Sequence, residues 1–355
     1  MGKFQPIQAA LEPLGGDMID EYFEQHFCGL YIEIFNFTRR IFGSHELEES
    51  EWPWLKVKRQ DGSDHLLNFV GAVARPGIQK KKWSEMLRDG EERSLLLQGI
   101  VMKALDEHVL SSPLFGATEE YQDKFIEKSC TISEGKLLPG FTSSAARTRA
   151  NKEYLRQHGW PTPCFWTDVD HVAAQMAMLL KPLLYATQGS DSMMHEMHQK
   201  LHEIVAYAAW LNLGLRISPS ITVVEWPRPG DPFKPDQVNM SDKILARNQI
   251  DAEVLVARTD LLPKRIVEAG VDLRFRVKIA VLPRIMRYSP GRDGLKVGIY
   301  SYRVMRPHAV FYQGWENDEI DQWGLSSCGV RVAHLNLCIE KMEEREEREN
   351  KESDS

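Results

Sequence analysis

The chain has 355 residues, of which 43% are hydrophobic and 27% charged, a balance typical of a globular protein. Its formal net charge is −7, no stretch reaches the roughly 20 apolar residues of a membrane helix, and the first residues lack the apolar core of a signal peptide. Five cysteines without a Cys-x-x-Cys spacing indicate reduced thiols, and so an intracellular protein of the cytoplasm or nucleus.

The first two thirds of the chain predict helices. Apolar residues recur in steps of three and four from Ile19 to Ile41, from Leu97 to Val109 and from Met194 to Leu215, the period of a core-facing helix. A further helix is predicted to start near Thr167-Asp-Val-Asp170, which matches a variant capping box. We therefore expect residues 1–216 to form a helical region.

Strand patterns follow Leu215. Ile221–Val224 predicts a short strand, and four prolines in the ten residues from Trp226 predict a linker or an ordered crossing loop. Residues 271–282 alternate between apolar and basic side chains, and 295–304 predicts a second strand after a turn signal. We expect these two strands to pair as a basic β-hairpin within residues 271–306, with one apolar and one cationic face.

The rest of the C-terminal region completes the predicted fold. Pro283 is expected to end the first strand of the hairpin, and His308–Tyr312 predicts a third strand. Residues 340–355 hold eight acidic and four basic residues, which predicts a charged tail that is disordered or a frayed helix. The sequence thus predicts an α+β fold, in which a mostly helical N-terminal two thirds packs with a smaller C-terminal antiparallel β unit inside an α+β region, 217–339.

A basic segment is the strongest indication of a partner. Between Arg274 and Arg306, nine basic residues stand against one acidic residue in a chain that is acidic overall. Clustered Lys and Arg attract phosphates and carboxylates, so an acidic protein or an anionic ligand is the expected partner. The expected contact residues are Arg274, Arg276, Lys278, Arg303 and Arg306. Alternatively, these cations face the chain's own carboxylates, or form a solvated strand face that resists edge aggregation.

Histidines supply two further candidates. His195, His198 and His202 fall on one strip of a predicted helix, and because imidazole binds zinc, iron and copper, the strip is a candidate metal site. No His-Glu-x-x-His pattern occurs, and histidines at the edge of a buried helix face are ordinary, so both interpretations stay open. His334 and Cys338 stand four residues apart, where packing is a simpler interpretation than catalysis.

One segment carries a resemblance. Gln98-Gly-Ile-Val-Met-Lys-Ala-Leu-Asp-Glu-His-Val-Leu-Ser-Ser-Pro-Leu-Phe115 is similar to a helical segment of uncharacterised proteins of filamentous fungi. The resemblance covers a few tens of residues and includes no catalytic motif. It implies a lineage-restricted intracellular protein and brings no activity or site residue with it.

The sequence leaves three classes of function. No Walker loop, nucleophile elbow or dinucleotide-binding turn occurs, so we expect a non-catalytic regulatory or interaction protein that binds an acidic partner or anionic ligand with its basic hairpin. One alternative is an enzyme acting on an anionic small molecule, with an arginine clamp and the histidine strip. Another is a nucleic-acid-binding protein, although no recognition motif accompanies the charges. No membrane partner is expected, and no particular cofactor is indicated.

Overall fold

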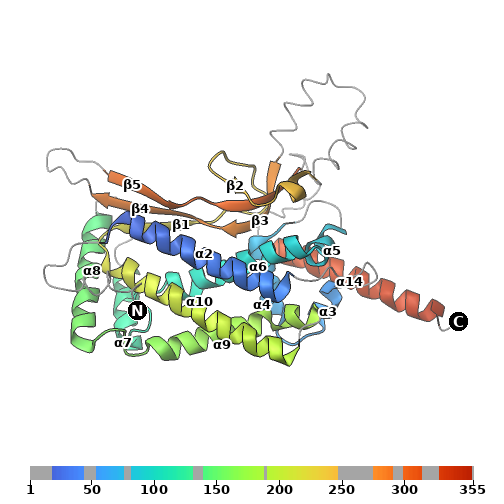
Figure 1. Cartoon of the computed structure of the whole chain (residues 1–355), viewed down its shortest axis with the longest axis horizontal. Coiled ribbons are helices and arrows are strands. Elements are labelled where there is room, and N and C mark those ends of the chain that lie inside the picture. The colour runs from blue at the N-terminus through green and yellow to red at the C-terminus, as the bar shows by residue number, and fades with distance from the viewer. Residues whose placement is uncertain are drawn as a thin grey trace, which may run out of the picture.

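The computed structural model describes residues 18–43, 53–75, 81–130, 139–187, 190–246, 275–290, 299–313 and 328–353. Helices make up most of the described N-terminal part, and the strands lie along one side of them (Figure 1). The predicted α+β class, a helical N-terminal bulk with a small C-terminal β unit, is confirmed. Within the described ranges, no helix combines the length and apolarity needed to cross a membrane.

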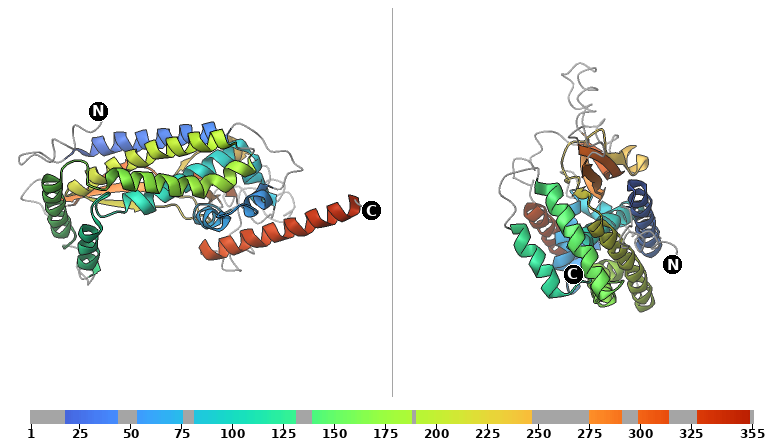
Figure 2. Two further views of the ribbon diagram at one scale, coloured as in Figure 1. Left: turned by 90° about the horizontal axis from the view of Figure 1, so that it is seen from below. Right: turned by 90° about the vertical axis from the view of Figure 1, so that its left-hand side faces the viewer.

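The long helices run side by side. α2, α9 and α10 lie together along the long axis of the molecule, while α14 lies on the opposite side (Figure 2). A π-helical turn, η2 (Asp106–Leu110), continues α6. The helix bounds are α2 (Asp20–Phe42), α3 (Pro53–Lys58), α4 (Ser63–Val73), α5 (Lys81–Arg88), α6 (Gly90–Leu105), α7 (Glu119–Cys130), α8 (Pro139–His158), α9 (Phe165–Ala186), α10 (Asp191–Ile217) and α14 (Cys328–Ser353).

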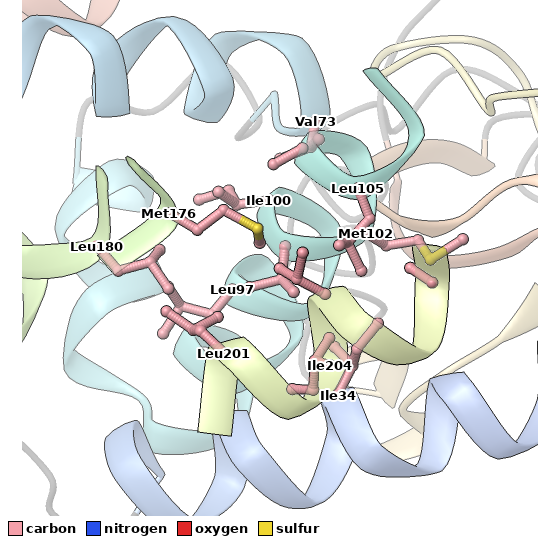
Figure 3. Close-up of a cluster of buried hydrophobic side chains, with 14 of the residues drawn as sticks. Ile34, Val73, Leu97, Ile100, Met102, Leu105, Met176, Leu180, Leu201 and Ile204 are labelled. Carbon is pink, nitrogen blue, oxygen red and sulfur yellow. The ribbon is translucent and has the colours of Figure 1, made fainter. Parts of the chain in front are cut away.

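The core is centred on α6, where every residue from Glu92 to Met102 is buried. Fully burying a Leu or Ile side chain contributes about 1.5–3 kcal/mol, so the burial of this helix contributes substantially to the folding free energy. Figure 3 shows the cluster where α2, α4, α6, α9 and α10 meet, with the labelled side chains Ile34, Val73, Leu97, Ile100, Met102, Leu105, Met176, Leu180, Leu201 and Ile204.

The helix starts in the structure agree only in part with those predicted from the sequence. The Asp89 carboxylate caps α6 by accepting the N–H groups of Glu91 and Glu92 at 2.9 and 3.0 Å. The capping box predicted at Thr167 is wrong, because α9 begins at Phe165 and Thr167 already lies inside its first turn. The hydroxyl and carboxylate of that motif are therefore helical side chains rather than caps.

The described strands form two sheets of three strands each. One sheet has the order β1-β4-β5 and is antiparallel; the other has the order β2-β6-β3, in which β2 and β6 are parallel. The strands predicted at Ile221–Val224 and His308–Tyr312 are confirmed as β1 and β6. The strand bounds are β1 (Ile221–Glu225), β2 (Val238–Asn239), β3 (Phe275–Leu282), β4 (Arg284–Pro290), β5 (Ile299–Met305) and β6 (His308–Gln313).

The predicted pairing of 271–282 with 295–304 is wrong. β3 pairs with β6, and the hairpin is formed by β4 and β5. Pro283 alone separates β3 from β4, and because proline has no N–H and a fixed φ, the chain leaves one sheet there and enters the other. The segment Arg284–Pro290, for which the sequence predicted no strand, is the central strand of its sheet.

The proline-rich segment is an ordered crossing loop that runs along the outer edge of β3. The N–H of Gly230 donates to the carbonyl of Val277 at 2.8 Å, and the N–H of Val277 donates to the carbonyl of Asp231 at 2.9 Å. Further along, the N–H of Phe233 donates to the carbonyl of Phe275 at 2.7 Å. The loop therefore satisfies the backbone groups that an edge strand would otherwise expose.

The charged tail is the outer part of α14. The first half of this helix packs on α4, where a Cβ at Gly71 would lie 2.4 Å from the Cγ2 atom of Val332. The second half extends away from the other helices (Figure 1), and Glu346 forms an ion pair with Arg59 there. The tail is helical through Ser353.

Candidate functional site

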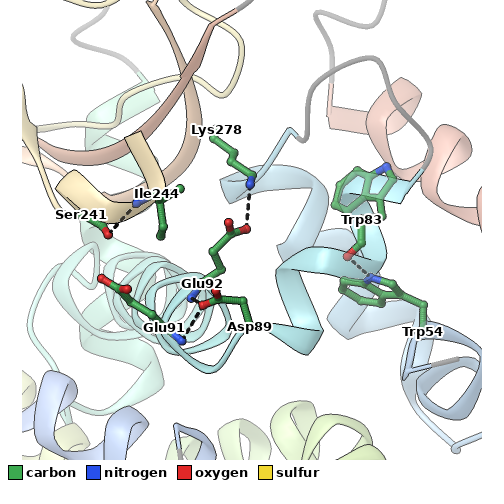
Figure 4. A network of polar contacts seen from close by, with 8 residues as sticks. All are labelled: Trp54, Trp83, Asp89, Glu91, Glu92, Ser241, Ile244 and Lys278. Carbon is green, nitrogen blue, oxygen red and sulfur yellow. Dashed lines mark hydrogen bonds and ion pairs between the residues drawn. The ribbon is translucent and has the colours of Figure 1, made fainter. Parts of the chain in front are cut away.

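Lys278, predicted to lie on an open cationic face, is buried. Its ammonium group donates to the Oε2 atom of Glu92 at 2.7 Å, and both side chains are only 2% exposed (Figure 4). Glu92 lies in the first turn of α6, where the helix dipole favours a carboxylate. The predicted open face is therefore absent at Lys278, because a buried charge has to be paired and its partner comes from a helix 186 residues earlier.

Two arginines of the basic segment are also engaged inside the chain. The Nη1 atom of Arg276 donates to the carbonyl of Gly230 at 2.9 Å. Arg287 is buried, its Nε atom donates to the Oδ1 atom of Asp20 at 2.6 Å, and its guanidinium lies 3.8 Å from the ring centre of Phe23. For Lys278 and Arg287 the structure agrees with the alternative that the cations face the chain's own carboxylates, whereas Arg276 donates to a backbone carbonyl.

Arg303 and Arg306 are different, because both remain exposed. Neither forms an ion pair with any residue in the described ranges. Arg303 lies on β5 opposite Met286 of β4, while its neighbour Tyr302 turns toward α2. Since neighbouring side chains alternate along a strand, Arg303 faces away from α2. Arg274, the fifth predicted contact residue, lies outside the described residues.

The histidines of α10 are not brought together as a metal site. The Nε2 atom of His202 lies 2.9 Å from the Oδ1 atom of Asp170 on α9, and its ring stacks on Trp166 with centres 6.1 Å apart. His195 is exposed and His198 is half-buried. No group of three His, Cys, Asp or Glu side chains suited to a metal ion occurs in the part of the chain that the structure describes.

His334 and Cys338 lie next to each other in a geometry that does not suit nucleophilic catalysis. The Nε1 atom of Trp83 donates to the Nδ1 atom of His334 at 3.2 Å, and an indole N–H can only donate. The neutral imidazole therefore carries its proton on Nε2, which faces the Sγ atom of Cys338 at 4.0 Å. A general base would need that nitrogen free to accept the thiol proton, so the structure favours the packing interpretation.

A polar cluster at the end of α6 was not predicted from the sequence. Asp106 is largely buried, and its Oδ2 atom accepts the indole N–H of Trp226 at 2.8 Å and lies 3.8 Å from the Nζ atom of Lys103. Burial raises the pKa of the Asp106 carboxyl, and the hydrogen bond from Trp226 and the charge of Lys103 oppose this shift only in part. The cluster joins α6 to the start of the proline-rich loop.

The same turn is held from α10 by Asn212, which is fully buried. Its Nδ2 atom donates to the carbonyls of Val109 and Ser112, both at 2.9 Å, and its Oδ1 atom accepts the N–H of Phe115 at 3.0 Å. A signal for this role exists in the sequence, because Asn212 is a polar residue between Leu211 and Leu213 in a core-facing stripe. The Asn212 side chain thus fixes the π-helical turn and the residues after it against α10.

Comparisons of the chain with protein-family models, with curated proteins and with solved structures found no match. The placement of the charged side chains is therefore the main indication of function. Among the predicted contact residues, the described structure leaves Arg303 and Arg306 as the exposed pair, and both belong to the end of the β4–β5 hairpin or the residues just after it.

Proposed function

We propose that this is a non-catalytic interaction protein that binds an acidic protein segment through its β4–β5 hairpin. One observation carries the proposal. Lys278 and Arg287 are paired with buried or half-buried carboxylates of the chain, whereas Arg303 and Arg306 stay at the surface without a described ion pair. An acidic partner would supply to these two arginines the carboxylates that the chain supplies to its other cations.

The two alternatives have less support. An arginine clamp for a small anionic substrate would need Arg276 and Lys278 to be available, and they are engaged by Gly230 and Glu92. The acid–base role of the histidine strip would need histidines near that clamp, but His202 is paired on the α9–α10 surface. A nucleic acid would bind the same two exposed arginines. A competition between an acidic peptide and an oligonucleotide distinguishes this alternative from protein binding.

The test is charge reversal at both exposed arginines. The probe is a fluorescently labelled peptide of about seven residues in which Glu and Val alternate. Its binding is measured by fluorescence anisotropy at low ionic strength. Arg303→Glu with Arg306→Glu should weaken binding by roughly tenfold or more, equivalent to about 1.4 kcal/mol. Arg149→Glu with Arg345→Glu makes the same charge change at exposed positions on α8 and α14 and should bind like the unmodified chain.

Three results would contradict the proposal. The peptide could fail to bind, the two double variants could lose affinity equally, or a single-stranded oligonucleotide could displace the peptide and bind more tightly than it. The third result would favour the nucleic-acid alternative, whose affinity should fall steeply with salt. Circular dichroism of each variant checks that the fold is retained.

A further inference from the structure

We infer that the acidic segment binds by adding a strand to the outer edge of β5, an inference that rests on the proposed function. β5 is the last strand of the sheet β1-β4-β5 and lies along its rim (Figure 1). One side of β5 pairs with β4, and no described strand pairs with its other side. In an antiparallel ladder every second residue turns its N–H and C=O away from the neighbouring strand, so this rim presents a row of backbone donors and acceptors.

The other sheet shows how this chain closes an edge. The outer edge of β3 is covered by the proline-rich loop, and the N–H of Arg75 adds a hydrogen bond to the carbonyl of Lys278 at 2.8 Å. β5 has no such cover from a described residue. Since unpaired edges favour aggregation, an edge that no described residue covers, in a chain that covers the edge of β3, is suited to a binding partner.

The sequence of β5 has little of the usual protection of an edge strand, because Arg303 is its one charged residue. Residues from Ile299 to Arg303 read Ile-Tyr-Ser-Tyr-Arg, with no proline and no lysine. They pair with β4 in regular register, because the irregularity in this ladder lies beyond them, next to Met305. Ile299 and Tyr300 are 68% and 54% exposed. β5 therefore offers about five regular residues, or about 17 Å of strand.

The two faces of β5 differ in charge, which predicts the pattern of the incoming segment. On the face toward α2, the hydroxyl of Tyr302 donates to the carboxylate of Glu24, and this bond, together with burial and the charges of Glu24, Glu21 and Asp20, raises the pKa of Tyr302 to about 12. This face is therefore negative and disfavours acidic side chains. On the opposite face Arg303 favours a carboxylate directly across from it.

The partner is accordingly an extended segment in which acidic residues alternate with apolar ones. The acidic side chains lie on the face of Arg303, and the apolar side chains lie beside the ring of Tyr300. In this mode of recognition the main-chain hydrogen bonds provide affinity and the alternating side chains provide specificity. A segment with consecutive acidic residues would place half of them over the carboxylates of α2.

Backbone methylation separates strand addition from simple charge attraction. Three versions of the Glu-Val peptide are compared: unmodified, N-methylated at every valine, and N-methylated at every glutamate. Side-chain face and hydrogen-bonding edge alternate together along a strand, so only one residue type directs its N–H groups at β5. We expect one methylated peptide to lose at least tenfold in affinity and the other to keep the affinity of the unmodified peptide.

The possible failures are distinguishable. Equal affinity of all three peptides, with loss of binding in the Arg303→Glu and Arg306→Glu double variant, would overturn strand addition and leave the proposed function standing. Absence of binding by any peptide would overturn both. A second copy of the chain seated on β5 would appear in sedimentation velocity as a concentration-dependent dimer to which the unmodified peptide does not bind, and this too would overturn the inference.

Discussion

At the scale of single residues, the buried pair of Lys278 and Glu92 shows how this chain uses its basic segment. A strand that alternates between apolar and basic side chains normally has one solvated face. Here the face that carries Lys278 is covered by α6, and a carboxylate in the first turn of that helix accepts the ammonium group. The charge therefore fixes the position of β3 against α6 and is withdrawn from any external partner.

Removing one member of this pair should cost more than removing both. Lys278→Met deprives the Glu92 carboxylate of its ammonium partner, and breaking a buried ion pair in this way costs about 3–5 kcal/mol of unfolding free energy. The double variant Lys278→Met with Glu92→Leu removes both charges and should recover most of that loss. Urea unfolding measures both values, and a double variant that is no more stable than the single one would contradict the expectation.

Asp106 should make stability depend on pH. Because burial raises the pKa of this carboxyl above 3.8, the folded chain binds the proton more tightly than the unfolded chain. The resulting stabilisation is complete below pH 3.8 and is lost as the pH rises through the folded-state pKa. Asn at this position does not titrate, so Asp106→Asn should become more stable relative to the unmodified chain as the pH rises toward neutral.

Urea unfolding of both chains at a series of pH values checks this expectation. The charged groups that act on Asp106 are Lys103 and Glu107, and Trp226 donates its hydrogen bond. Subtracting the unfolding free energy of one chain from that of the other at each pH removes the contribution of groups distant from this site. A difference that stays constant across the range, or that favours the unmodified chain increasingly with pH, would show that the Asp106 pKa is not raised.

At the scale of elements, Asn212 determines how α6 ends. The carbonyls of Leu110 and Ser112 are shared with Arg216, but the N–H of Phe115 has the Asn212 side chain as its acceptor. Asn212→Leu should lower the unfolding free energy by about 1–3 kcal/mol, because it leaves a buried backbone donor unsatisfied. Hydrogen exchange at the Phe115 amide should accelerate at the same time.

Gln175→Leu is a suitable control for this change. Gln175 is an exposed amide on α9 that contacts His171, so its replacement should change stability by no more than about 0.5 kcal/mol. Similar losses in the two variants, or an unchanged exchange rate at the Phe115 amide, would contradict the role of Asn212 in the π-helical turn.

Sequence reasoning succeeded for elements whose signal is local. α2 and α10 were predictable because their apolar stripes repeat over many turns, and β1 and β6 because each is a short apolar run. The pairing of the hairpin was not predictable, since β4 is recognised only by its position between β1 and β5. The burial of Lys278 was not predictable for the same reason. No pattern around Lys278 shows that Glu92 will lie beside it.

At the scale of the whole molecule, charge is divided between interior and surface. Residues 340–355 carry an acidic excess, yet the carboxylates that pair with the buried Lys278 and Arg287 come from helices early in the chain, α2 and α6. The carboxylates in the outer part of α14 are therefore not the partners of these buried strand cations. Its described contact near the end is the exposed ion pair of Glu346 with Arg59, and such pairs stabilise by about 0–1 kcal/mol.

Truncation of α14 should accordingly leave the rest of the molecule intact. Deleting residues 347–355 removes exposed side chains such as Glu347 and Arg348, and the unfolding free energy should change by no more than about 0.5 kcal/mol. Leu335→Ala, in the half of α14 that packs on the core, should instead cost about 2–5 kcal/mol, because Leu335 is fully buried.

Guanidinium unfolding followed by circular dichroism compares the two changes, with the truncated chain also losing helical signal in proportion to the residues removed. A truncation that costs as much as Leu335→Ala would mean that the charged half of α14 contributes to the fold. It would then contact the other helices in solution, since a helix that buries no apolar side chain beyond Met342 gains stability only through such contacts. An unchanged unfolding free energy would place the anchorage of α14 in its first half, where Leu335 and Val332 lie against the helical core.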